Sequence, residues 1–217
     1  MRFFRTVWLV TQKDLVIEAR SKEILYTTLF FAVACVLVFA FGFVKEGRAI
    51  EDAAAGILWI AIAFSGTLAL GRAFERERQS ETLRALMIAP IDRPALYLGK
   101  LVGVLLLLVA VEVVVVPLVG LLFQAALFAH LWLMLGLLAT GTIGFAAVGT
   151  LFAAMLVRAR SRDVLLPVLL YPITIPVIIA GVRGTAALLQ VTITSTLRLI
   201  SSSARGANRS SLPSAHR

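Results

Sequence analysis

The amino-acid sequence predicts an all-α protein that crosses a membrane several times, and two observations lead to this prediction. Hydrophobic residues make up 60% of the 217-residue chain and charged residues only 15%, whereas soluble domains usually contain about 45–50% apolar and about 25% charged residues. The apolar residues also occur in runs of about 20, the length that an α-helix needs to cross a bilayer. This composition excludes a disordered chain, a disulfide scaffold and a coiled coil. The net charge of +9 does not indicate nucleic-acid binding, because the basic residues lie between the apolar runs.

Residues 1–23 are predicted to form an amphipathic helix ahead of the first span. At 100° per residue, one arc is apolar (Phe3, Phe4, Val7, Trp8, Val10, Leu15) and the opposite arc is polar (Arg2, Arg5, Gln12, Lys13, Arg20, Glu23). Such a helix lies in the membrane interface; the alternative is a solvated N-terminal tail. Asp14 and Glu18 interrupt the apolar arc, so we expect part of the helix to dock on protein.

Five apolar runs are long enough to span the membrane. We expect a permease domain at 24–182, with spans at about 24–44, 53–71, 101–123, 132–157 and 164–182. The first run is longer than the apolar part of a signal peptide and no cleavage site follows it, so we expect it to be retained. A short outer turn around 124–130 separates the third and fourth spans.

The positions of the Lys and Arg residues predict the orientation of these spans. Fourteen of them lie in the N-terminal segment, the loop at 72–100 and the loop at 158–163, whereas two lie in the 45–52 loop and the 124–131 turn. Cytoplasmic loops are enriched in basic residues. We therefore expect the N-terminus and the first group of loops to be cytoplasmic.

The C-terminal part of the chain has a different composition. From Gly184 onward it is rich in Thr, Ser and Arg. Residues 183–200 are at best a marginal sixth span, because 185–200 would reach only about 24 Å across a core of roughly 30 Å. Residues 201–217 are predicted to be disordered. Five spans would leave the C-terminal arginines outside, whereas a sixth span would return most of them to the cytoplasm.

The motifs of common enzyme and metal sites are missing from the sequence. There is no G-x-x-x-x-G-K-[ST] loop, so we expect this chain not to hydrolyse ATP, and no Cys/His cluster has metal-ligand spacing. His130, beside Trp132, is more typical of an interfacial residue than of a haem or metal ligand. Cys35 is the only cysteine and cannot form an intrachain disulfide. We expect no cofactor to be bound by this chain.

Glu112 is the one ionisable residue deep inside a predicted span. Such residues are costly in a membrane and are functional candidates by default; the alternative is a carboxyl group hydrogen-bonded to Thr or Ser of a neighbouring helix. Pro167, Pro172 and Pro176 leave backbone carbonyls of the fifth span unpaired, which is tolerated where protein or a cavity satisfies them. A hinge or substrate path and ordinary bundle packing both remain possible for these residues.

The fourth span contains small residues at four-residue spacing, which lets helices approach closely. One row consists of Thr142, Ala146, Thr150 and Ala154, and a neighbouring row consists of Gly136, Thr140 and Gly144.

The 72–100 loop is the most informative segment, because it contains a short amphipathic helix. Ser80 is a suitable N-cap and Glu81 places a carboxylate where the helix dipole favours it. An apolar stripe follows, and Pro90 limits the helix. The stripe predicts docking on a partner protein; the alternative is a helix that rests on lipid headgroups. The candidate coupling residues are Gln79, Ser80, Glu81, Thr82, Leu83, Leu86, Met87 and Pro90.

With its T-L-x-x-L, P-I and G-K elements, this loop resembles those of the transmembrane subunits of type-2 ABC exporters. More specifically, the chain resembles the haem exporter protein B family, the membrane subunit of the bacterial cytochrome c maturation system. The likeness covers about residues 1–183. It is carried by Gly56, Trp59, Leu68, Leu70, Arg72, Phe74, Gln79, Leu83, Leu86, Met87, Pro90 and Lys100, and by the P-I-T-I-P element at Pro172–Pro176.

The resemblance implies six spans with both termini cytoplasmic, in the bacterial inner membrane, and a homodimer. It also implies a cytoplasmic ATP-binding cassette subunit that hydrolyses ATP, haem-handling membrane subunits and a periplasmic haem chaperone, with haem as a possible substrate. The sequence departs from the family in two ways: it has Ser80-Glu81-Thr82 where many relatives carry a glycine before the Ser/Thr, and it lacks the expected apolar sixth span. Three functions stay open: export of haem or another reductant-linked molecule, ATP-driven release of loaded chaperone, and transport of an unrelated lipid or drug.

Overall fold

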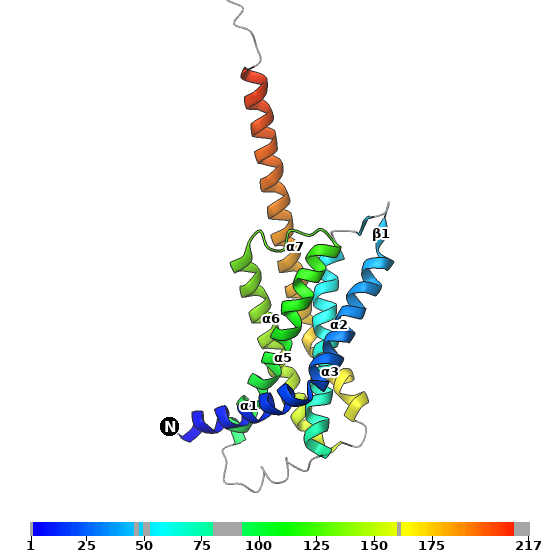
Figure 1. The fold of residues 1–217 in the computed structure, drawn as a ribbon, viewed down its shortest axis with the longest axis vertical. Helices are drawn as coiled ribbons and strands as arrows, with labels where there is room; N and C mark the ends of the chain where they lie inside the picture. The colour runs from blue at the N-terminus through cyan, green and yellow to red at the C-terminus, as the bar shows by residue number, and fades with distance from the viewer. Residues whose placement is uncertain (1, 46–47, 50–52, 80–92, 160–161, 211–217) are drawn as a thin grey trace, which may run out of the picture.

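The computed structural model describes residues 2–45, 48–49, 53–79, 93–159 and 162–210, and it shows an all-α membrane protein. Five long apolar helices stand side by side, and an N-terminal helix lies across one end of the bundle (Figure 1). Each of the five is long and apolar enough to cross a membrane. The predicted all-α polytopic fold is therefore confirmed.

The five long helices are α2 (Glu23–Gly42), α3 (Ala54–Gln79), α5 (Arg93–Leu122), α6 (Leu131–Met155) and α7 (Arg162–Ser210). A two-stranded antiparallel ribbon, β1 (Val44–Lys45) and β2 (Arg48–Ala49), follows α2, and a short 3-10 turn, η2 (Leu156–Arg158), precedes α7. α3 and α5 extend beyond the expected spans 53–71 and 101–123, because both helices continue out of the apolar core toward the loop that joins them.

Several hydroxyl groups inside the helices are hydrogen-bonded to their own backbone. Thr28, Ser65 and Thr174 donate to carbonyl oxygens one turn earlier, at 2.6–2.9 Å. Lipid offers no hydrogen-bond partner, so this local bonding lets polar residues sit in membrane helices.

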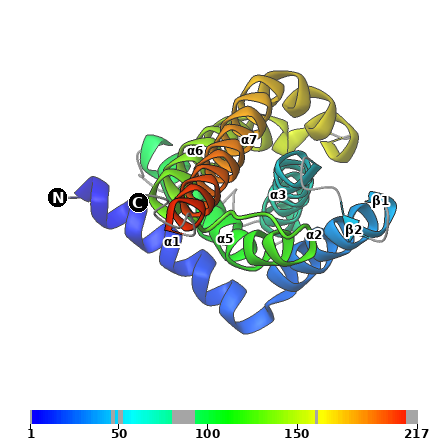
Figure 2. The ribbon, with the colours of Figure 1, turned by 90° about the horizontal axis from the view of Figure 1, so that it is seen from above.

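α3 is the most enclosed helix of the bundle. In its most apolar stretch 72% of the helix is buried, against 22–44% for the other four. It contacts α2, α5, α6 and α7, and these helices surround it in the view from above (Figure 2). The protein core therefore forms around α3.

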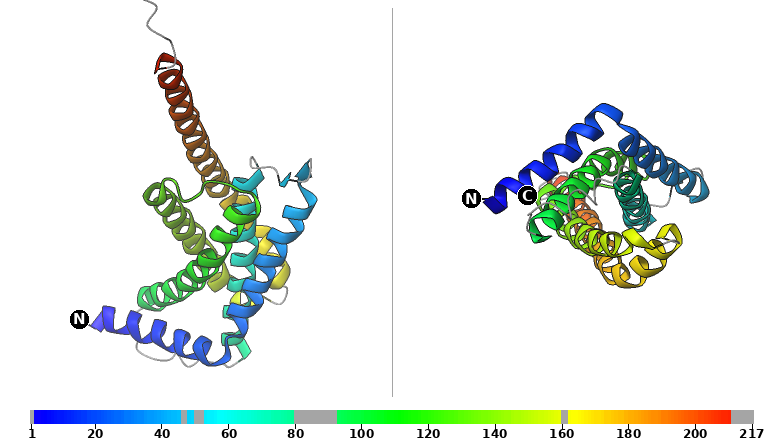
Figure 3. Two further views of the ribbon diagram at one scale, coloured as in Figure 1. Left: turned by 45° about the horizontal axis from the view of Figure 1, so that its top comes forward. Right: turned by 90° about the horizontal axis from the view of Figure 1, so that it is seen from below.

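The N-terminal helix α1 (Arg2–Ser21) turns into α2 at Lys22, whose φ of 53° is left-handed. Seen from below, α1 runs alongside the start of α5 (Figure 3). Thr11 and Glu18 are buried, whereas Phe4 and Trp8 are 79% and 62% exposed. The expected docking on protein is confirmed, while the interfacial position of the exposed aromatic residues stays a prediction.

The C-terminal half of α7 differs from the prediction in its last ten residues. Residues 183–200, which are not expected to form a stable sixth span, continue α7 in one helix to Ser210, so residues 201–210 are helical rather than disordered. The physical reason is that no proline lies between Pro176 and Pro213, and extension of an existing helix needs no new nucleus. The rest of the predicted disordered tail, 211–217, lies outside the described residues. At 49 residues α7 is about 74 Å long and projects beyond the bundle (Figure 1).

Candidate functional site

The predicted coupling loop begins where α3 ends. Gln79 is the last residue of α3, whereas Ser80, Glu81, Thr82, Leu83, Leu86, Met87 and Pro90 lie outside the described residues. The amphipathic helix expected there stays a prediction. The structure does describe the two flanks of the loop, residues 72–79 of α3 and 93–100 of α5, which we call the loop stems. Both stems contact α1.

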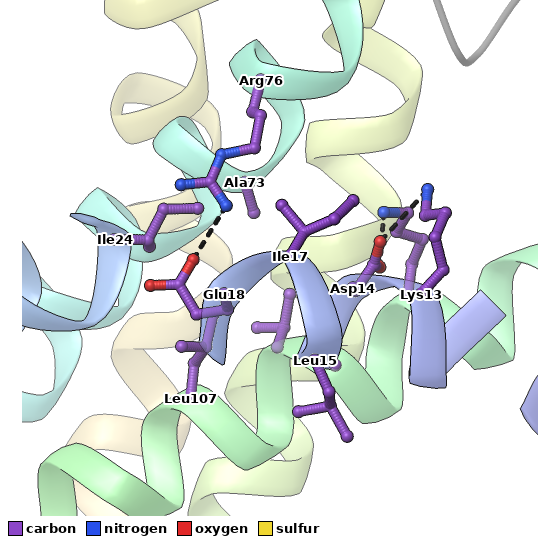
Figure 4. Close-up of a pocket in the computed structure, with 12 residues that line it drawn as sticks. Lys13, Asp14, Leu15, Ile17, Glu18, Ile24, Ala73, Arg76 and Leu107 are labelled. Atoms are coloured by element: carbon purple, nitrogen blue, oxygen red, sulfur yellow. Dashed lines mark hydrogen bonds and ion pairs between the residues drawn. The ribbon is translucent and has the colours of Figure 1, made fainter. Parts of the chain in front are cut away.

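Arg76 ties the first loop stem to α1. Its Nη1 atom lies 2.9 Å from Oε2 of Glu18, and its Nη2 atom donates to the Ser21 hydroxyl at 3.0 Å and lies 3.7 Å from the Glu23 carboxylate. The other oxygen of Glu18 accepts the backbone N–H of Leu25 at 2.8 Å. Glu18 therefore has a partner for each carboxylate oxygen at the corner between α1 and α2. Figure 4 shows its ion pair with Arg76.

Lys100 ties the second loop stem to the same helix. Its Nζ atom lies 2.6 Å from Oδ2 of Asp14, and only 9% of the Lys100 side chain is exposed. Next to it, the Thr11 hydroxyl donates to the Gly99 carbonyl at 3.1 Å. A methyl group added at Gly99 would lie 2.7 Å from Cβ of Val10, so α1 can lie this close to α5 only because residue 99 is glycine.

The two ion pairs border a small cavity between α1, the start of α2, α3 and α5 (Figure 4). Its volume is about 70 Å³, and apolar side chains including Ile24, Val104 and Leu107 line it beside the charged groups. This space fits a few water molecules and is far smaller than a haem group. The cavity is therefore part of the contact between α1 and the loop stems.

Through these contacts α1 connects both ends of the coupling loop. Asp14 and Glu18, the residues that interrupt the apolar arc of α1, are the ones that pair with Lys100 and Arg76. Ion pairs that are partly shielded from water are screened less by salt than exposed pairs. These two pairs therefore attach both loop stems to the same helix.

Glu112 lies inside the bundle and is hydrogen-bonded to a neighbouring helix. It is 8% exposed on α5, and the Thr142 hydroxyl of α6 donates to its Oε1 atom. Among the described residues, no basic side chain forms an ion pair with it. The expected threonine partner is present, and a functional role for Glu112 stays a prediction.

Pro167, Pro172 and Pro176 all lie within α7, which stays helical through them. The first part of α7, in yellow, runs in a different direction from the rest, in orange and red (Figure 2). Prolines cause such bends because they remove backbone hydrogen bonds and crowd the preceding turn. A bend of α7 in the region of these prolines agrees with this cause, and a hinge role for them stays a prediction.

Only some residues of the predicted small-residue rows of α6 are buried within this chain. Thr142, Ala146 and Thr150 are buried, and the Thr150 hydroxyl has no hydrogen-bond partner among the described residues. Gly144 is half-buried beside Val177. The side of α6 that carries Gly136, Thr140 and Ala154 is exposed, so these three do not pack helices together within one copy of the chain.

Other glycines form the closest helix contacts, and the sequence reasoning missed them. Large side chains of α3 pack against glycines of α6, with Trp59 on Gly141 and Leu70 on Gly149. In the opposite direction, Phe145 of α6 packs against Gly66 of α3. A methyl group added at Gly66 would lie 2.6 Å from the Phe145 ring. The sequence shows these glycines and the large side chains, but it does not show which helices are neighbours, so the pairs could not be assigned.

His130 lies at the N-terminus of α6 with its side chain exposed. In the described part of the chain, no group of three or more His, Cys, Asp or Glu residues is placed to hold a metal ion. The role of His130 as an interfacial residue stays a prediction.

The family described as "CcmB protein" matches residues 5–207 of this chain, which covers nearly all of the helices described above. The chain belongs to the CcmB family. The match extends beyond residue 183, where the likeness seen in the sequence motifs ended, and includes most of the C-terminal half of α7.

Several relatives of this CcmB-family chain carry the name "Heme exporter protein B". The one from Rhodobacter capsulatus is 32% identical over 152 residues, covering 70% of this chain and 69% of the relative. The one from Paracoccus denitrificans is 31% identical over 155 residues, covering 71% and 70%. The one from Haemophilus influenzae is 28% identical over 171 residues, covering 78% and 76%. The predicted resemblance to the haem exporter protein B family is confirmed.

Proposed function

We propose that this chain is the membrane permease subunit of an ATP-driven haem exporter that serves the biogenesis of c-type cytochromes. The observation that carries the proposal is the CcmB-family match over residues 5–207, together with relatives named "Heme exporter protein B". Five helices that can span a membrane agree with a multi-pass membrane subunit.

ATP hydrolysis belongs, in this proposal, to a separate cytoplasmic ATP-binding cassette subunit. That subunit binds the loop between the stems, with Leu83, Leu86 and Met87 in its cleft. Two features support this: the apolar stripe in the sequence and the contacts that hold both stems on α1. The other partners are haem-handling membrane subunits, a periplasmic haem chaperone and a second copy of this chain.

The proposed orientation places the N-terminus and α1 on the cytoplasmic side. The described parts of the Lys- and Arg-rich segments that precede α7, namely α1, the two loop stems and η2, lie at the same end of the bundle (Figure 1). The positive-inside rule then assigns this end to the cytoplasm. The C-terminal part of α7 projects from the opposite end (Figure 1), so in this orientation residues 193–210 lie on the outer side.

The experiment that tests the proposal is reconstitution of the chain with its ATPase and haem-handling partners in liposomes, followed by addition of ATP and labelled haem. We expect ATP-dependent transfer of haem across the bilayer, and restored c-type cytochrome formation when the chain is returned to a cell that lacks its own copy. If cytochrome formation is restored while no haem crosses, the chain serves ATP-driven chaperone release instead. If neither occurs, the proposed function is wrong.

A further inference from the structure

The enclosed helix α3 connects the coupling loop to the far end of the bundle. It leaves the loop at Gln79 and carries Trp59 about 20 residues away, which is about 30 Å along a helix. Trp59 is 2% exposed although it is the largest side chain of the core. A movement of the loop stem that travels along α3 to the outer end of the bundle therefore passes through Trp59.

The Trp59 indole joins α3 to two other helices at once. A methyl group added at Gly141 of α6 would overlap the outer edge of the six-membered ring of the indole. A methyl group added at Gly181 of α7 would overlap the indole at the bond that its two rings share. The indole N–H donates to the Thr185 hydroxyl of α7 at 3.0 Å, and Thr185 is fully buried. Close packing against Gly141 and Gly181 thus fixes the position of the indole, and its hydrogen bond to Thr185 fixes the orientation.

The contact with α7 lies just beyond the proline bend. A second contact with α3 lies just before the bend, where the Tyr171 ring is 5.5 Å from the Phe64 ring. Pro172 and Pro176 lie between these two attachment points. A helix segment with missing backbone hydrogen bonds is softer than its flanks. When α3 tilts, its two contacts with α7 move by different amounts, and the bend can absorb the difference.

We propose that Trp59 is the positioning residue through which α3 moves the outer segment of α7 about the bend at Pro172 and Pro176. Packed side chains are nearly incompressible. When α3 moves, the outer parts of α6 and α7 therefore move with it, because the Trp59 ring cannot shift relative to Gly141 and Gly181. This inference rests on the proposed function, because the movement of α3 starts at the loop that the ATPase subunit drives.

The test uses the assembled complex and three variants of the Trp59 contact. Thr185→Val keeps the shape of the side chain and removes only the hydrogen-bond acceptor. Trp59→Phe keeps an aromatic ring and removes the N–H and the ring edge on Gly141. The matched controls are Gly56→Ala, on the same helix with no atom within 4 Å of the added methyl group, and Thr194→Val, an exposed residue whose hydroxyl bonds only to its own helix. Gly181→Ala, which displaces the ring, completes the set.

The first readout is the distance between α6 and α7 at the outer end. Leu137 of α6 touches Gly184 of α7, so Leu137→Cys and Gly184→Cys in a Cys35→Ala background can be joined by a short thiol cross-linker. We expect the cross-linking yield of the parent complex to change when ATP is added. With Thr185→Val or Trp59→Phe the yield should no longer respond to ATP, whereas both controls should behave like the parent.

The second readout is the amount of cytochrome c formed per ATP hydrolysed. Loss of coupling should lower it at least about fivefold, the scale of a typical coupling free energy, while ATP hydrolysis continues. A merely structural role would lower complex assembly and ATP hydrolysis together. The inference is wrong if Thr185→Val and Trp59→Phe keep both the ATP-dependent change in cross-linking and the parent coupling ratio. Failure of the parent complex to form cytochrome c would refute the proposed function, while the cross-linking readout would still decide on Trp59.

Discussion

The two ends of the bundle are held together by different forces. At the end where α1 lies, two ion pairs, Asp14 with Lys100 and Glu18 with Arg76, supplement the close contact of α1 with Gly99. In the outer half, the Trp59 ring packs closely against Gly141 and Gly181 and donates one hydrogen bond to Thr185. Charge suits a boundary that water and lipid headgroups reach, whereas close packing and a few shielded hydrogen bonds are what hold helices together within lipid.

The two kinds of contact respond differently to a movement of the helices. Ion pairs between long side chains tolerate small displacements, so the loop stems can move while staying attached to α1. The contacts of the Trp59 ring with Gly141 and Gly181 tolerate almost none, so the outer parts of α6 and α7 must follow α3. The loop end is therefore the adjustable end, and the outer end is the rigid one.

The largest effect is expected from Leu86→Asp in the coupling loop. An apolar anchor of this size contributes roughly 1.5–3 kcal/mol when buried, and a charge in the same cleft costs more, so co-purification with the ATPase subunit should be lost while the protein still inserts. Leu86→Met, which conserves volume, should retain binding. Unchanged co-purification of the aspartate variant would mean that the loop rests on lipid, and the loop end would then have no driving partner.

A smaller effect, on stability, is expected from Gly141→Ala at the rigid end. The added methyl group overlaps the Trp59 ring, and overpacking of this kind typically costs about 1–3 kcal/mol. The free energy of unfolding, measured by denaturant titration in mixed micelles, should fall by this amount. Gly56→Ala, with open space around its added methyl group, should be close to neutral. Equal behaviour of the two variants would show that the outer end is not tightly packed.

Removal of one ion-pair partner at the adjustable end should cost less than overpacking at the rigid end. Arg76→Ala leaves Glu18 without its cation; the two side chains are 27% and 11% exposed, so the cost should lie between the values for surface and buried pairs, at about 1–2 kcal/mol. The loss should shrink in high salt, whereas that of Gly141→Ala should not. Arg72→Ala, at an exposed position one turn earlier, serves as the control.

The smallest effect is expected at the corner between α1 and α2. Lys22 has a φ of 53°, which costs roughly 1 kcal/mol for a residue with a Cβ. Lys22→Gly should therefore be stabilising by up to about 1 kcal/mol, and Lys22→Ala, which removes the charge but keeps the Cβ, should give no gain. A thermal-unfolding comparison of the two variants checks this. Equal stability would show that the corner is not strained.

Sequence reasoning located the spans well, because length and apolarity alone determine which segments can cross a bilayer. It also identified Asp14 and Glu18 as residues out of place on an apolar arc. It did not find the Trp59 contact with Gly141, Gly181 and Thr185, because in a membrane helix the buried and lipid-facing sides are equally apolar. It was wrong about residues 201–210, where serine-rich composition suggested disorder but the helix of α7 simply continues.

The most direct test of the account is to determine which end faces the cytoplasm, because only there can an ATP-binding subunit reach the loop. In a Cys35→Ala background, Arg84→Cys in the coupling loop and Phe128→Cys in the outer turn, where the native side chain is 55% exposed, are treated with a membrane-impermeant thiol reagent. We expect Arg84→Cys to be labelled only in inside-out vesicles and Phe128→Cys only in right-side-out vesicles. Labelling of Arg84→Cys from outside intact cells would contradict the orientation, and with it the proposal that an ATPase moves α3 through this loop.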